Sequence, residues 1–181
     1  MKKLFLALLA MVAFVACNNT DYDYEYEFEI ANGVFVSGAV EPITYEQFCE
    51  EVVGSAWAAD LSSARLILED GSIDNKPHYE LTVGGAYTHF YFDKNSIVVY
   101  IDKAIIKGYV VSDYQYDEGV IISDMYTEPI LSILELEKDK MICIQHVGWT
   151  PNIGSRFIIC TYNRLDEDEY EKIKYEYTHE L

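Results

Sequence analysis

Cysteine and histidine are the residue types in this chain best suited to chemistry, and two cysteines stand out by their spacing. Cys143 and Cys160 lie at equal distances from the middle of the segment 148–155. A hairpin symmetrical about that segment would set them opposite each other on antiparallel strands, where a disulfide forms if the β-carbons approach to about 3.8 Å. The alternative is a pair of buried free thiols. Neither a C-x-x-C pair nor a Cys/His cluster points to zinc.

The other metal-ligating residue types form weaker patterns. His78 and His89 fall on consecutive predicted strands, where exposed or hydrogen-bonded histidines are more common than a metal pair. Asp70, Ser72 and Asp74 have the spacing that begins a calcium loop, but the later ligands of such a loop are missing and Asp70 followed by glycine is explained as a turn. We therefore expect no metal and no cofactor.

Motifs that carry catalysis are missing from the sequence. It has no G-x-S-x-G, no H-E-x-x-H and no glycine-rich phosphate loop. No set of nucleophile, base and orienting residue can be drawn. We expect no catalytic residues and a protein that is not an enzyme.

One tryptophan stands in a segment that reads as a loop. Trp149 lies within 148–155, with His146 close before it. A tryptophan on a loop is unfavourable unless it is buried or meets a partner. One hypothesis is that Trp149, with His146 at the rim, contacts an apolar or glycan ligand. The alternative is that Trp149 folds over the end of the domain as a plug.

A single short helix is predicted before the strands. Thr44 is placed as its N-cap and Gln47 three residues later completes a capping box, with Ile43 and Phe48 at the staple positions. The apolar spacing continues to Val53, and Gly54 provides the stop. These signals predict a helix over Tyr45 to Val53.

After the helix the apolar period changes to two. Turn residues separate the predicted strands, which are Trp57–Leu68 (broken at Ser62-Ser63), His78–Val83, Ala86–Phe92, Ile97–Ile101, Ala104–Asp113 (with Gly108 as a bulge), Val120–Asp124, Ile130–Glu137, Met141–Val147 and Arg156–Arg164. Short strands at regular spacing favour a mainly β fold, an antiparallel meander closed into a barrel or folded as a sandwich. The last segment, Asp166–Leu181, fits a helix slightly better than a strand.

The segment Asp21–Ile30 alternates acidic and apolar residues without a fault. Period two would place five carboxylates on one face and the aromatic side chains of Tyr22, Tyr24, Tyr26 and Phe28 on the other. The simplest interpretation is an edge strand protected from aggregation by its charges. The position of these acidic residues, soon after Cys17, also resembles that of the surface-export signals of lipoproteins from anaerobic gut bacteria. Both interpretations stay open.

Charge excludes one class of partner. The formal net charge is −18 at pH 7. Such a chain repels nucleic acid and anionic lipid headgroups, so we expect no nucleic-acid binding. Half of the residues are hydrophobic, which argues for a folded domain rather than a disordered acidic chain.

The first seventeen residues resemble the signal of a bacterial lipoprotein. Lys2 and Lys3 precede an unbroken apolar run from Leu4 to Ala16, too short to span a bilayer as a mature helix. The run ends Phe14-Val15-Ala16-Cys17, which is similar to a lipobox, although Phe14 replaces the usual leucine. The resemblance implies cleavage before Cys17, acylation of its thiol and anchoring in the outer membrane, at the periplasmic face or the cell surface. The alternative is ordinary secretory cleavage.

A capped helix followed by Gly54 and Trp57 resembles the start of the lipocalin-like domains of bacterial lipoproteins, although lipocalins have one residue fewer between these two. The resemblance implies an up-and-down barrel with Gly54 and Trp57 in structural roles and an interior that can hold one small ligand. The predicted organisation is a signal peptide (1–16), a lipidated Cys17 with an acidic tether or edge strand (17–30), a lipocalin-like β domain (31–165) and an acidic C-terminal segment (166–181). The expected function is a lipid-anchored binding or accessory protein, and the alternative is a protein-interaction module with a filled barrel.

Overall fold

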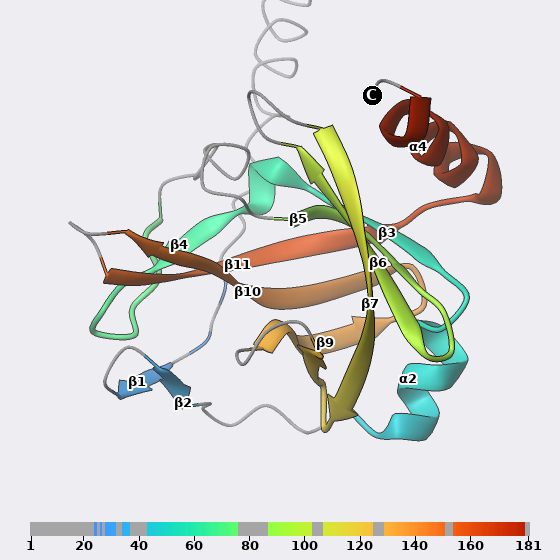
Figure 1. The fold of residues 1–181 in the computed structure, drawn as a ribbon. Helices are drawn as coiled ribbons and strands as arrows, with labels where there is room; N and C mark the ends of the chain where they lie inside the picture. Colours follow the sequence, from blue (N-terminus) through green and yellow to red (C-terminus); the bar gives the residue numbers. More distant parts are fainter. Residues whose placement is uncertain are drawn as a thin grey trace, which may run out of the picture.

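The computed structural model shows a β-barrel with one helix at an end and a second helix on its outer surface (Figure 1). It describes residues 24, 26, 28–31, 34–36, 43–75, 87–102, 107–124, 129–150 and 154–179. The elements are β1 (Glu29–Ala31), β2 (Val34–Val36), α2 (Tyr45–Glu51), β3 (Ala56–Ala59), the 3-10 turn η1 (Leu61–Ser63), β4 (Arg65–Ile67), β5 (Tyr87–Phe92), β6 (Ser96–Asp102), β7 (Lys107–Asp117), β8 (Val120–Ser123), β9 (Pro129–Glu137), β10 (Lys140–Thr150), β11 (Gly154–Arg164) and α4 (Glu167–His179).

Strand pairing closes the main sheet on itself. In the described part of the chain, nine strands follow the order β10-β9-β8-β7-β6-β5-β3-β11-β4, and β10 also pairs with β11. Every pairing is antiparallel, and β3 and β4 share β11 as a partner because η1 interrupts one long strand. The mainly β prediction is confirmed, and of the two architectures left open the barrel is the correct one.

Helix α2 forms because its ends are specified locally. The side chain of Thr44 accepts a hydrogen bond from the backbone N–H of Gln47 at 3.2 Å, as the capping box predicts. Phe48 and Val52 are fully buried against the barrel, whereas Tyr45 is 58% exposed. Gly54, just beyond the helix, has φ +82°, a conformation that glycine adopts without strain. The predicted helix is confirmed, and it ends two residues earlier than expected.

Two apolar clusters lie on opposite faces of the barrel wall. The larger fills the interior and includes α2. The smaller lies outside, on the face here called the outer wall, made by the side chains of Ile67, Leu134, Ile142, Ile144, Phe157 and Ile159. Alternate residues of β10 and β11 therefore enter different clusters, as the pleat of a strand requires.

Three aromatic residues from the acidic N-terminal segment cover the outer wall. Tyr24, Tyr26 and Phe28, here called the strap, pack against its apolar side chains. The shared aromatic face that the alternation predicts is thus confirmed for these three residues. They are outside any strand, however, and β1 pairs only with β2 in a separate two-stranded sheet, so the predicted long edge strand is wrong.

Helix α4 covers the opposite outer side of the barrel. At its start, the N–H of Glu169 donates to the Asp166 carboxylate at 2.8 Å, and the Asp166 N–H donates to Glu169 at 3.2 Å. Tyr170 stacks on Tyr91 of β5, with ring centroids 4.7 Å apart. Tyr177 is buried, 5.2 Å from the ring of Tyr100 on β6. The helical prediction for this segment is confirmed and the strand alternative is wrong.

Two details of the predicted strands are wrong. Gly108 is not a bulge, since β6 and β7 pair in continuous register past it. A register shift occurs instead between β5 and β6, at Tyr87/His89. The segment 148–155 is not one loop, because β10 continues to Thr150 and β11 begins at Gly154. The predicted strand His78–Val83 lies outside the described residues.

Across the described ranges, no helix combines the length and the apolar character needed to cross a membrane. The apolar run Leu4–Ala16 and Cys17 lie outside those ranges.

Candidate functional site

Large aromatic side chains fill the barrel interior next to α2. Phe48 is fully buried, with its ring 4.2 Å from Tyr116, 5.7 Å from Phe92 and 6.1 Å from Tyr114, measured between centroids. The hydroxyl of Tyr116 donates to the backbone carbonyl of Ile43, just before the helix. These rings pack α2 against this end of the interior.

The two residues that carry the lipocalin resemblance also lie at this end. Trp57 of β3 is fully buried in the interior cluster. The N–H of Gly54 donates to the carbonyl of Phe92 at 2.7 Å, which ties the end of α2 to β5. Both residues thus pack or bond within this end of the barrel.

Towards the other end, the interior side chains become smaller and partly polar. On β7 the residues of the interior face are half-buried, and Val110 pairs with Val99 of β6. Ser112 lies on the same face of β7, and its hydroxyl is 2.8 Å from that of Ser123 on β8. Ser123 is fully buried.

A buried amide lies on the interior face of another strand, β10. Gln145 is fully buried. It lies on the same face of β10 as Met141 and Cys143, which belong to the interior cluster. Its backbone lies between Leu131 of β9 and Ile158 of β11. We call the group Val99, Val110, Ser112, Ser123 and Gln145 the polar half of the interior.

The cysteine pair adjoins the polar half. Cys143 and Cys160 face each other directly in the β10–β11 register, as their spacing predicts. Both thiols are nevertheless free, so the structure lacks the disulfide that the spacing suggested. The Cys160 sulfur is engaged elsewhere, 3.5 Å from the Ser63 hydroxyl and 3.4 Å from the Thr161 carbonyl. Burial raises the pKa of Cys160 to about 12 and that of Cys143 well above its usual range.

His146 and Trp149 follow Gln145 along β10. In the backbone register, His146 pairs with Phe157 and Trp149 with Ser155, and the register shifts between the two residues. Trp149 is therefore on a strand rather than on a loop. The side chains of both residues lie outside the described part of the structure.

The polar half and the adjoining cysteines present uncharged groups. The polar half offers hydroxyl and amide groups, which donate and accept hydrogen bonds without charge. Thiols with a raised pKa stay protonated at neutral pH and are weak nucleophiles. A mostly apolar surface with a few placed polar groups is the composition of small-molecule sites.

No metal centre is formed within the described ranges, where no three His, Cys, Asp or Glu side chains lie close enough to hold an ion. The Asp70 carboxylate instead accepts hydrogen bonds from the Ser72 N–H at 3.0 Å and from its hydroxyl at 2.5 Å, the pattern of a turn. His78 lies outside these ranges.

Sequence reasoning missed Gln145 and the Ser112–Ser123 pair. A usable signal existed for the first: Met141, Cys143 and Gln145 share one face of a predicted strand. A polar residue on an otherwise apolar interior face is informative, because burying an amide is unfavourable unless it is hydrogen-bonded.

No protein-family model matches the sequence, and no curated protein matches it. Among solved structures, the chain is similar to bovine odorant binding protein complexed with its natural ligand, with 12% identity, a TM-score of 0.38 and coverage of 66% of this chain and 77% of the other. A deswapped triple mutant of bovine odorant binding protein gives 11% identity, a TM-score of 0.32 and coverage of 67% and 78%. The strand order and register of the chain itself define the barrel.

Proposed function

We propose that this protein is a lipid-anchored, non-enzymatic binding or accessory protein of the cell envelope that holds a small apolar or glycan ligand in its barrel. One observation carries the proposal: the interior changes from an aromatic layer beside α2 to smaller apolar side chains with the polar side chains of Ser112, Ser123 and Gln145. A few polar groups placed on an otherwise apolar surface are what orients a small ligand in a binding site.

The anchoring part of the proposal is supported by the sequence alone. The positive start, the apolar run and the ending Ala16-Cys17 fit an acylated N-terminus. Several acyl chains on one residue anchor a protein stably, at about 0.8 kcal/mol for each buried CH₂ group. Outer-membrane attachment, at the periplasmic face or the cell surface, follows from the same resemblance.

Trp149 and His146 are proposed as residues at the entrance of the same site. Their support is their order on β10, where they continue the strand beyond Gln145 and away from α2. Trp149→Ala distinguishes this role from that of a plug. Weaker ligand binding with unchanged thermal stability supports the entrance role, whereas unchanged binding with lower stability supports the plug.

The decisive experiment is native mass spectrometry of the protein purified from its host. A retained small molecule supports the ligand-binding function, and a retained protein favours the alternative below. Binding of an apolar fluorescent probe, N-phenyl-1-naphthylamine, then locates the site. Val110→Trp fills the polar half and should abolish probe binding, whereas Val111→Trp, on the outer face of the same strand, should leave it intact.

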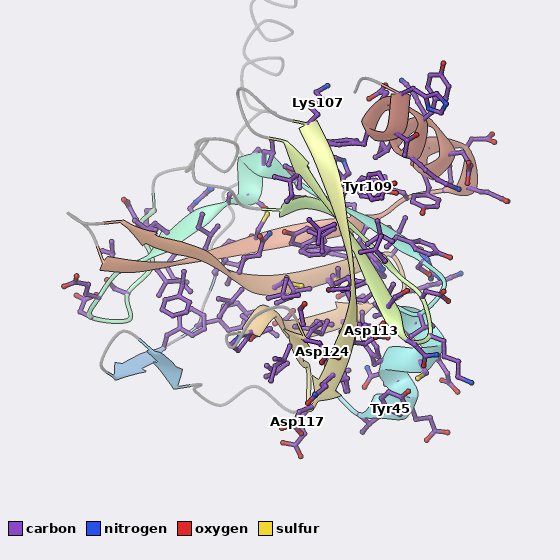
Figure 2. The ribbon with its side chains drawn as sticks, viewed as in Figure 1. Tyr45, Lys107, Tyr109, Asp113, Asp117 and Asp124 are labelled. Atoms are coloured by element: carbon purple, nitrogen blue, oxygen red, sulfur yellow. The ribbon has the colours of Figure 1, made fainter. Side chains whose placement is uncertain are left out.

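A protein-interaction module is the second candidate, and the outer face of β7 favours it. Tyr109 is 46% exposed and Val111 52% exposed, and Asp113 and Asp117 follow on the same face. Figure 2 shows Tyr109, Asp113 and Asp117 along this strand. Apolar side chains beside carboxylates would suit a basic partner. In this case Val111→Trp would impair partner capture and Val110→Trp would not.

A further inference from the structure

The strap is fastened to the outer wall by both hydrogen bonds and packing. The hydroxyls of Tyr24 and Thr161 are 3.0 Å apart, and the hydroxyl of Tyr26 donates to the Glu135 carboxylate at 2.6 Å. The rings stack in series, with centroids 6.3 Å apart for Tyr24–Tyr26 and 5.7 Å for Tyr26–Phe28. Burial raises the pKa of both tyrosines, so the phenols stay neutral in the docked state.

Phe28 is held most closely of the three. Its side chain is 8% exposed within the outer-wall cluster. Its backbone carbonyl passes so near Gly71 that a β-carbon on that glycine would lie 1.9 Å from the oxygen. Gly71 therefore provides the space that lets the strap lie flat on the turn after β4.

The strap leaves little free chain between Cys17 and Tyr24. Seven residues along the chain lead from Cys17 to Tyr24. A fully extended chain of that length spans at most about 25 Å. A barrel on a long lipid-anchored tether would be free to rotate. Here the tether joins the barrel at Tyr24, which lies on the outer wall beside Thr161 of β11.

We infer that the strap orients the barrel at the membrane, with the outer wall of β9, β10 and β11 turned towards the lipid headgroups and α4 turned away. The inference rests on the proposed acylation of Cys17. Its geometric basis is that α4 packs on β5 and β6, and β6 lies four strands from β10 in the closed sheet. The two coverings of the barrel, strap and α4, are therefore on opposite sides.

The test measures energy transfer from the protein to the membrane. Full-length acylated protein carrying Cys49→Ser receives one donor dye, either at Glu69→Cys beside the Gly71 turn or at Lys172→Cys on α4. It is placed in phosphatidylcholine vesicles with an acceptor on the headgroups. With a tether of at most ~25 Å, we expect transfer about two-fold higher from position 69 than from position 172.

Two variants test whether the strap causes the difference. Tyr24→Ala with Tyr26→Ala should release it and make the two positions equal. An insertion of about twelve Gly/Ser residues after Asn19 lengthens the tether without touching the barrel and should reduce transfer at both positions. Equal transfer in the acylated parent, or a difference that survives strap release, would overturn the inference alone. An intact mass without acyl chains would overturn the anchoring and the inference together.

Discussion

Arg164 lies over the ring of Trp57, with the guanidinium carbon 5.8 Å from the ring centroid. The two residues are also backbone partners across β11 and β3. The same guanidinium donates to the Lys138 carbonyl at 3.1 Å and to the Ser55 hydroxyl, and it lies 4.0 Å from Glu51 of α2. One side chain thus joins the first and last strands of the barrel to the helix and to the β9–β10 turn.

Removing this side chain should destabilise the barrel. We expect Arg164→Ala to lower the free energy of unfolding by about 2 kcal/mol, because a cation–π contact and hydrogen bonds from a charged donor are both lost. Lys174→Ala is the control, because its ion pair with Glu171 is exposed and should contribute little to stability. Urea denaturation measures both. Equal losses for the two variants would show that the Trp57 contact contributes little.

Phe48 should be the most sensitive position of α2. Phe48→Ala leaves a cavity among Phe92, Tyr114 and Tyr116 and should cost about 3–5 kcal/mol. Tyr45→Ala, at an exposed position of the same helix, should lower the stability much less than Phe48→Ala. Denaturant unfolding with near-ultraviolet circular dichroism checks the difference. Similar losses would mean that the aromatic layer is not rigid.

Gly71 and Gly54 form a matched pair for testing the strap. Both have positive φ, so alanine at either site should cost about 1–2 kcal/mol through backbone strain. Only at Gly71 does the new β-carbon collide with the Phe28 carbonyl, since Gly54 has open space around it. Chymotrypsin should therefore cut the strap faster in Gly71→Ala than in Gly54→Ala. The same cleavage rate in both variants would contradict the close packing of Phe28.

The buried thiols should react only after unfolding. Cys49 is half-buried, whereas Cys143 and Cys160 are fully buried with raised pKa values. In native protein acylated at Cys17, a thiol reagent such as Ellman's should modify Cys49 alone, and Cys49→Ser should remove this fast reaction. Denaturant should then expose Cys143 and Cys160. A Cys49→Ser protein with no thiol even in denaturant would instead contain the Cys143–Cys160 disulfide.

Alkaline pH should destabilise the fold through its tyrosines. Burial raises the pKa of Tyr114 and Tyr116 to about 12 and that of Tyr162 well above its usual range. An unfolded phenol ionises near pH 10, so the folded state binds more protons above that pH. Stability should be unaffected below pH 10 and should fall as the pH rises through 12. Phenolate absorbance at 295 nm should show a late fraction that titrates together with unfolding.

The helices and most strands could be predicted because their signals are local. The Thr44 cap, the change of period after Gly54 and the turn at Asp70 each depend on a few neighbouring residues. The β1–β2 pairing was missed, although Asn-Gly separates the two runs in the sequence and is a strong hairpin signal.

The site was harder to predict because it depends on closure of the sheet. Cys143 and Cys160 could be paired because they share one hairpin. Ser112 and Ser123 meet through another hairpin, whereas Gln145 comes from β10, which lies two strands from β8 in the folded sheet. The Ser63 hydroxyl, which η1 places 3.5 Å from the Cys160 sulfur, likewise comes from a distant part of the chain. Such contacts follow from tertiary packing and not from spacing.

Tyr24 and Thr161 are 137 positions apart, yet their hydroxyls meet. During synthesis the strap leaves the ribosome early, and the strand that receives it is made almost last. Until then the apolar residues of β9 and β10 have no cover, which is the kind of surface that aggregates or recruits chaperones. The strap must thus wait for almost the whole chain before its partners exist, and the outer wall is covered only once β11 has been made.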